Sequence, residues 1–208
     1  MSSSESGKLF IFEGPNGCGK TVISRLFAEH LSALGMPSQW LAFPGREPGT
    51  LGLHVYEIHR NHMGVGIEAI HPASLQALHI AAHIDQIETR ILPALRQGIS
   101  VVLDRFWWST WVYGLSAGVP EESLRRMLHV EALHWQGTLP NAVFLFECEM
   151  PFDEPFSAGW AILRQAYEAL AATEQSRHSV IRIQNAGNPK EVLAQAVLSA
   201  QLKSLPSQ

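Results

Sequence analysis

Residues 14–21 read GPNGCGKT and satisfy the pattern GxxxxGK[ST]. The apolar segment 8–13 precedes this motif, and residues 23–34 behind it carry apolar side chains at helical spacing. A glycine-rich turn between a strand and a helix brings backbone N–H groups close to phosphate oxygens, and the helix N-terminus adds partial positive charge. The motif, called the phosphate loop below, therefore predicts a site for a nucleoside triphosphate.

The positions of the phosphate loop have distinct expected tasks. Lys20 is expected to reach the outer phosphates of ATP, and Thr21 to place its hydroxyl on Mg²⁺. Cys18 is interpreted as a small residue that fits the loop, with a thiol of lowered pKa beside the helix N-terminus as the alternative. The residues expected to bind the nucleotide are Gly14, Asn16, Gly17, Cys18, Gly19, Lys20 and Thr21.

Strands alternate with helices along the chain, which predicts a three-layer α/β/α fold of the P-loop NTPase type with a mostly parallel five-stranded sheet. The expected strands are residues 8–13, 39–43, 99–103, 142–146 and 179–183. The expected helices are residues 23–34, 50–62, 121–135, 158–172 and 189–202, and a long one that starts at Pro72. Because Pro93 lacks a backbone N–H, we expect it to kink or shorten that long helix.

Composition narrows the class of protein. The 208 residues are 46% hydrophobic and 16% charged, which suits one domain over residues 8–208 behind a flexible polar tail, residues 1–7. A net charge of −4 argues against a nucleic-acid partner, and no apolar run approaches the ~18 residues that span a bilayer. Two cysteines outside any CxxC pair suit a reducing compartment. We therefore expect a cytoplasmic protein whose partners are small molecules.

Two further motifs follow the phosphate loop in order. Residues 46–50 read REPGT, and Asp104-Arg105-Phe106 is followed by Ser109 and by Tyr113-Gly114. With residues 13–21, EGPNGCGKT, these motifs resemble those of the thymidylate kinase family, which carries EGxDGxGKT, REPGGT and DRYxxSxxAYQG. The resemblance runs from about Lys8 to Phe146. It implies an ATP- and Mg²⁺-dependent nucleoside monophosphate kinase that acts on a (deoxy)pyrimidine monophosphate such as dTMP. It also makes a homodimer, the family's usual state, a candidate assembly.

The resemblance also assigns catalytic residues. An acceptor phosphate beside a triphosphate must have its repulsion neutralised, and arginine offers a bidentate fork for that task. By resemblance, Arg46 and Arg105 clamp the acceptor phosphate, while Lys20 and Asp104 complete the catalytic set. Asp104 ends a strand and is expected to hold Mg²⁺ together with Thr21; the alternative is that it only orients Arg105.

The same resemblance implies four further substrate contacts: Glu47, Ser109, Thr110 and Tyr113. Tyr113 would stack near the sugar and crowd a ribose 2′-hydroxyl. Ser109 and Thr110 would contact the pyrimidine, or could equally cap a helix. Glu47 is also the carboxylate base that a deoxynucleoside kinase would need, which keeps that activity as an alternative.

The chain departs from the family pattern at four places. Asn16 replaces an aspartate, Gly114 replaces a glutamine, and residues 80–84 lack the aromatic and arginine side chains that contact the base. The lid segment, residues 151–159, is short and acidic, and its only nearby arginine is Arg164. The family places a catalytic arginine in the phosphate loop or the lid. Because an arginine that stabilises the transferring phosphoryl group contributes on the order of 10³–10⁵ in rate, a slow or non-catalytic nucleotide-binding protein is a further alternative.

Histidines and tryptophans are abundant, with ten and six in the chain. His79 and His83 have a spacing suited to zinc, but no cysteine or HExxH pattern accompanies them, so we do not expect a structural metal site. Trp107 and Trp108 follow the Asp104-Arg105 motif. They either wall the acceptor pocket or belong to the core or a dimer surface.

Overall fold

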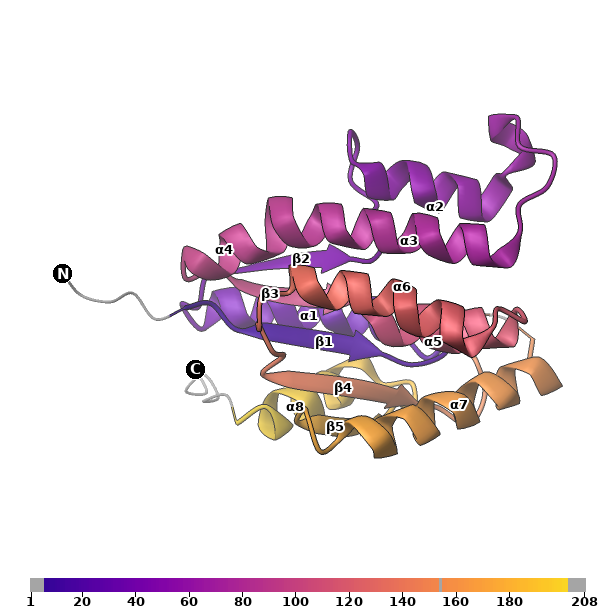
Figure 1. The fold of residues 1–208 in the computed structure, drawn as a ribbon. Helices are drawn as coiled ribbons and strands as arrows, with labels where there is room; N and C mark the ends of the chain where they lie inside the picture. Colours follow the sequence, from indigo (N-terminus) through magenta and orange to yellow (C-terminus); the bar gives the residue numbers. More distant parts are fainter. Residues whose placement is uncertain (1–5, 154, 202–208) are drawn as a thin grey trace.

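A five-stranded sheet forms the centre of the molecule, as Figure 1 shows. The computed structural model describes residues 6–153 and 155–201. The strands are β1 (Leu9–Glu13), β2 (Ser38–Ala42), β3 (Ser100–Asp104), β4 (Ala142–Glu147) and β5 (Val180–Gln184). They lie in the order β2-β3-β1-β4-β5, and every neighbouring pair is parallel. The predicted α/β fold with a five-stranded sheet is confirmed.

Helices cover both faces of the sheet, so each face has its own apolar core. The helices are α1 (Lys20–Ala33), α2 (Leu51–Asn61), α3 (Pro72–Gln86), α4 (Leu92–Arg96), α5 (Trp107–Ser116), α6 (Glu121–His134), α7 (Ala158–Glu174) and α8 (Pro189–Ser199). One core, against α1 and α8, is rich in phenylalanine: the rings of Phe12, Phe27 and Phe144 have centroids 4.8–5.4 Å apart. The other core includes residues of α4, α5 and α7 and of the segment 87–91 that precedes α4. Outside this layer, α2 packs on α3 at the edge of the molecule (Figure 1).

The long helix predicted from Pro72 is interrupted earlier than Pro93. It changes at Ile87 into a π-helical segment, η2 (Ile87–Ile91), and continues as α4, in whose first turn Pro93 lies. A proline without N–H cannot donate to the preceding turn, and a widened turn before it accommodates that loss. Pro93 therefore distorts the helix without ending it.

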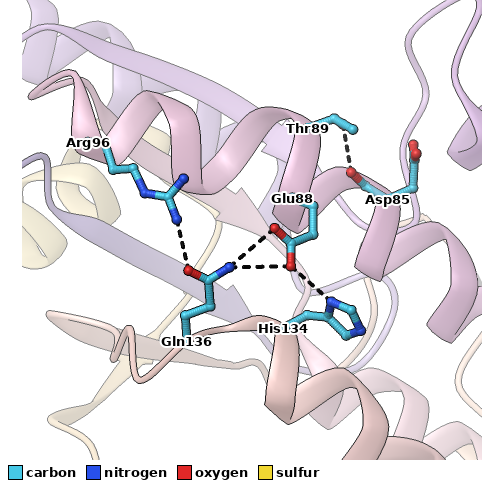
Figure 2. Close-up of polar contacts among 6 residues, drawn as sticks. All are labelled: Asp85, Glu88, Thr89, Arg96, His134 and Gln136. Atoms are coloured by element: carbon cyan, nitrogen blue, oxygen red, sulfur yellow. Dashed lines mark hydrogen bonds and ion pairs between the residues drawn. The ribbon is translucent and has the colours of Figure 1, made fainter.

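The π segment is tied to the end of α6 by polar contacts, which Figure 2 shows. Glu88 Oε1 pairs with His134 Nδ1 at 2.9 Å and accepts from Gln136 Nε2, and Arg96 Nη2 donates to Gln136 Oε1 at 2.8 Å. The hydrogen bond from His134 lowers the pKa of Glu88. From the π segment, Thr89 Oγ1 donates to the carbonyl of Asp85 in α3.

Helix α5 was not predicted from the sequence, although it carries most of the third family motif. It starts three residues after β3 ends and packs closely on α6 at Gly114. A Cβ at Gly114 would lie 2.6 Å from Leu124 Cδ2, so the two helices approach closely at this glycine, where the family pattern has glutamine.

The described part of the chain bears on the remaining predictions about organisation. Ser6 Oγ and Gly7 N both donate to the carbonyl of Leu95, while residues 1–5 of the predicted tail lie outside the described residues. Residue 154 of the lid segment and residues 202–208 also lie outside them. Across the ranges that are described, no helix is both long enough and apolar enough to cross a bilayer.

Candidate active site

The phosphate loop lies at the carboxyl edge of the sheet, between β1 and α1, and side chains from the C-terminal half support it from outside. Trp160 Nε1 donates to the carbonyl of Asn16 at 2.8 Å, and Asn185 Nδ2 donates to that of Cys18 at 2.9 Å. The backbone of Phe152 donates to the carbonyl of Gly17 at 2.9 Å. These donors occupy carbonyls of the loop. The N–H groups of residues 17–19 donate no hydrogen bond within the described ranges, so they are available to an anion.

Gly19 is the position at which the loop needs glycine most clearly. It caps α1 with φ of 77°, in the left-handed region, and a Cβ there would lie 2.5 Å from Asn185 Nδ2. A side chain at this position would displace the amide that holds the loop.

Lys20 is buried and turned back onto the loop. Its Nζ donates to the carbonyl of Pro15 at 2.5 Å, and burial lowers the pKa of this ammonium group to about 8. A cation that has lost its water and holds only a carbonyl gains strongly from a phosphate oxygen. The lysine is thus poised to exchange one partner for a stronger one.

Thr21 and Asp104 meet beside the loop and offer oxygen ligands. Thr21 Oγ1 donates to Asp104 Oδ2 at 2.5 Å. The second oxygen, Asp104 Oδ1, is buried and has no hydrogen-bond partner among the described residues. A buried carboxylate oxygen without a partner, beside a hydroxyl, fits Mg²⁺, a hard cation that prefers oxygen ligands. No group of three or more metal-binding side chains occurs in the ranges that the structure describes, so the histidines build no such cluster there.

Arg105 follows β3 in a strained backbone conformation that aims its side chain at the phosphate loop. Its φ is 76°, and its N–H donates to the carbonyl of Phe12 at 2.9 Å. The guanidinium donates to Ser109 Oγ at 2.9 Å and to Asn16 Oδ1, and lies 5.6 Å from the centre of the Tyr113 ring. Asn16, where the family has aspartate, therefore bonds the arginine without neutralising its charge.

Glu13, the last residue of β1, organises this region and was not assigned a role from the sequence. Its buried carboxylate accepts from the backbone of Phe106 at 2.7 Å and of Ser109 at 3.0 Å, and from Ser109 Oγ at 2.9 Å. It thereby caps α5. Burial raises the pKa of Glu13, and the charges of Arg105 and Lys20 oppose that rise. The available signal was a carboxylate at the end of an otherwise apolar strand.

A cavity of about 290 Å³, called the main cavity below, opens beside the phosphate loop. It is lined by Asn16, Phe43, Pro44, Arg46, Tyr56, His59, Arg60, Gln76, His79, His83, Arg105, Phe106, Ser109, Thr110 and Tyr113. Three of these are arginines from three different segments, and the guanidinium groups of Arg46 and Arg60 lie 4.7 and 5.7 Å from the ring centre of Tyr56. Arg60 and Tyr56 were missed by sequence reasoning, although they lie on one face of the predicted helix 50–62.

One wall of the main cavity is polar and rich in histidine. Gln76, His79 and His83 share a face of α3, and His59 on α2 holds His79 through an Nδ1–Nε2 contact of 2.8 Å. Burial lowers the pKa of His79 to about 3 and also lowers that of His59. Both rings are therefore neutral near pH 7, and each presents one donor and one acceptor. Of residues 80–84, the stretch that matches the family's base-contacting pattern, only His83 lines this wall.

His83 is fixed from behind the cavity wall. Its Nδ1 pairs with Glu131 Oε2 at 2.9 Å, and its ring stacks on that of Phe43 with centroids 3.9 Å apart. Both members of the His83–Glu131 pair are buried. The pair sets the orientation of the imidazole edge that faces the cavity.

Some residues named in the sequence analysis do not line the main cavity. Glu47 does not line the main cavity; its carboxylate lies 3.8 Å from Arg90 Nη1 at a half-exposed position. Trp108 is fully buried and Trp107 packs against the same core, so neither walls the cavity. Burial raises the pKa of the Cys18 thiol, which contradicts the alternative of a lowered one.

The lid segment lies against the phosphate loop and brings an acidic group close to it. A Cβ at Gly17 would meet Pro151 at 2.5 Å and Asp153 Oδ1 at 2.8 Å. Arg164, one turn beyond Trp160 on α7, lies 3.7 Å from Glu168, and its buried Nε has no hydrogen-bond partner in the described ranges. This arginine is the one basic side chain of α7.

Comparison with known proteins agrees with this geometry. Residues 12–153 match the sequence profile of the family described as thymidylate kinase. A thymidylate kinase of Pelotomaculum thermopropionicum is 33% identical over 192 residues, which cover 84% of this chain and 85% of that protein. One from Caldanaerobacter subterraneus is 37% identical over 136 residues, covering 65% and 61%.

A solved structure has the same fold. The crystal structure of thymidylate kinase from Ehrlichia chaffeensis superposes with a TM-score of 0.71 at 21% identity, covering 93% of this chain and 98% of that one. The loop, the Asp104-Arg105 pair and the cavity beside them agree with the sequence matches above. These matches show that the chain belongs to the thymidylate kinase family.

Proposed function

We propose that the chain transfers the γ-phosphoryl group of ATP to the phosphate of a deoxypyrimidine monophosphate such as dTMP. The observation that carries the proposal is the meeting of Arg46, Arg60 and Arg105 in one cavity that also touches Asn16 of the phosphate loop. Three cations beside a triphosphate loop suit a second, doubly charged phosphate, and a neutral acceptor hydroxyl would not need them.

The phosphate loop and Lys20 hold the donor. The free N–H groups of residues 17–19 and the α1 N-terminus bind phosphate oxygens, while Lys20 leaves the carbonyl of Pro15 for the outer phosphates. Thr21 and Asp104 would hold Mg²⁺, which, when bound, neutralises charge on the phosphate oxygens. Phosphoryl transfer needs little covalent help, so this positioning and charge supply most of the rate.

Arg105 and its partners position the acceptor. Its guanidinium is held by Ser109 and Asn16 at the boundary between loop and cavity, where acceptor and donor phosphates would meet. Tyr113 lies beneath the same guanidinium, and its hydroxyl accepts from the N–H of Asn16 at 3.0 Å, which fixes the ring next to the sugar position. Arg46 supplies further charge, and Thr110 and the histidine wall face the base.

A deoxynucleoside kinase is less well supported. Such an enzyme needs a carboxylate base at the acceptor hydroxyl, and Glu47, the candidate for it, pairs with Arg90 outside the main cavity. The short lid affects rate more than reaction type, because an arginine that stabilises the transferring phosphoryl group contributes to the rate.

The test is ADP release by the full chain with ATP and Mg²⁺ and a panel of monophosphates and nucleosides. We expect turnover with dTMP and none with thymidine, and a kcat lower by about 10²–10³ or more with Lys20→Ala. Turnover with nucleosides alone would overturn the proposal, as would nucleotide binding without turnover on any monophosphate. The cytoplasmic location and the homodimer stay predictions.

A further inference from the structure

The two cysteines of the chain meet at the base of the phosphate loop. Cys18 belongs to the loop, and Cys148 directly follows β4, 130 positions away in the sequence. Their sulfur atoms lie 2.6 Å apart, and both residues are free thiols. Both are buried, at 0% and 4% exposure. This contact involves no other part of the proposed catalytic arrangement.

We propose that Cys18 and Cys148 form a reversible disulfide when the protein meets a peroxide, and that the bond clasps the phosphate loop to the end of β4 without changing the loop's shape. Two thiols and one hydrogen peroxide give one disulfide and two waters. The sulfurs lose two electrons, the O–O bond takes them up and breaks, and both thiol protons end in water.

The reason to expect a clasp, and not a distortion, lies in what already holds the loop. The carbonyls of Asn16, Gly17 and Cys18 are each bound by donors from residues that follow β4 or β5. A bond from Cys18 to Cys148 would add a covalent tie at the same place, from the same side. The sulfurs are already closer than non-bonded sulfur atoms normally approach, so the bond needs little movement of the loop backbone.

Burial sets the rate of this reaction. It raises the pKa of Cys18, and it also raises that of Cys148. The thiolate is the species that attacks a peroxide, so the reaction should be slow at neutral pH and faster as the pH rises. The pair would therefore respond to sustained oxidising conditions.

Thiol labelling with mass spectrometry tests the proposal directly. The full chain is treated with hydrogen peroxide, denatured and alkylated. We expect a product with no alkyl label that has lost two hydrogen atoms, yields a peptide joining Cys18 to Cys148, and regains two labels after dithiothreitol. Two labels after peroxide, or oxygen addition to sulfur without a cross-link, would overturn the proposal.

Stability and ligand affinity test the clasp. A disulfide between residues 130 positions apart in the chain should raise the melting temperature by at least about 5 °C. It should leave the MgATP dissociation constant within about threefold of the reduced value. Cys148→Ala, with Cys148→Ser as a second variant, should bind MgATP normally and show no peroxide-induced shift. A cross-link without the rise, or with weaker MgATP binding than stated, contradicts the clasp, and the cross-link itself is measured independently of the proposed kinase activity.

Discussion

The phosphate loop and the histidine wall of the main cavity are built in opposite ways. The loop is one continuous segment, residues 14–21, that brings the N–H groups of residues 17–19 together with Lys20 and Thr21, the first two residues of α1. The wall is assembled from His59 on α2 and from Gln76, His79 and His83 on α3, and depends on how the two helices pack. Binding a phosphate tail therefore needs a local sequence, whereas choosing a base needs a tertiary arrangement.

This contrast explains where the chain keeps the family pattern and where it departs. The loop, Asp104 and Arg105 meet through neighbouring strands β1 and β3, so each is confined by the sheet. The wall lines the cavity with histidines, and residues 80–84 lack the aromatic and arginine side chains of the family pattern. We infer that a substitution at the loop affects the transfer step, while a substitution at the wall affects the choice of base.

The largest effect is expected from Lys20→Ala. The substitution removes the cation that would follow the transferring phosphoryl group, so kcat should fall by about 10²–10³ or more. Steady-state ADP release measures it, and Lys20→Arg, which keeps the charge in another shape, should lose less. Equal activity of Lys20→Ala and the unmodified protein would remove the loop from the mechanism.

Arg105→Ala should act on the acceptor side. It removes a bidentate fork held by Ser109 and Asn16, and kcat/KM for the monophosphate should fall by about 10²–10³. The MgATP dissociation constant, measured by calorimetry, should stay within about threefold. The matched control is Arg90→Ala, which removes an arginine outside the main cavity and should leave acceptor use unchanged.

MgATP affinity should depend on pH through Lys20. Because the pKa of Lys20 is lowered to about 8 in the free protein, the charged form is lost as the pH rises through 8. Bound phosphates favour the charged form, so affinity should weaken by up to about tenfold per pH unit above 8 and binding should take up a proton there. Calorimetry in two buffers of different ionisation enthalpy measures this uptake. Affinity that stays flat from pH 7 to 9.5 would contradict the prediction.

The smallest effect is expected from His79→Ala. It breaks the contact with His59 and changes the base-facing wall, and KM for the acceptor should rise by about two- to tenfold while MgATP affinity is unchanged. His54→Ala, at an exposed site on α2, is the matched control. If both variants behave alike, the wall does not contact the base.

The limits of sequence prediction follow from the same contrast. All five strands were predicted to within a residue or two, because each is a short apolar run between turn signals. Helix α5 was missed because Glu13, far away in the chain, caps it through Phe106 and Ser109. Local sequence carries no such signal.

The cavity wall shows the same limit. Residues 80–84 occupy the family's base-contacting stretch, yet Ile80 is buried and does not line the main cavity, while His79 beside it does. Which face of α3 points inward is set by its packing against α2 and α6. The spacing of residues in the sequence shows which of them share a face of a helix, but not whether that face points into the cavity.

The central claim is that a triphosphate loop and an arginine cavity hold two phosphate groups side by side. Its most direct test is the affinity of thymidine and adenosine joined through five phosphates, measured by calorimetry with Mg²⁺. Because one molecule would occupy both sites, we expect it to bind at least about 100-fold tighter than ADP, and Arg105→Ala to abolish that gain. Affinity no better than that of ATP, in the unmodified chain, would contradict the account.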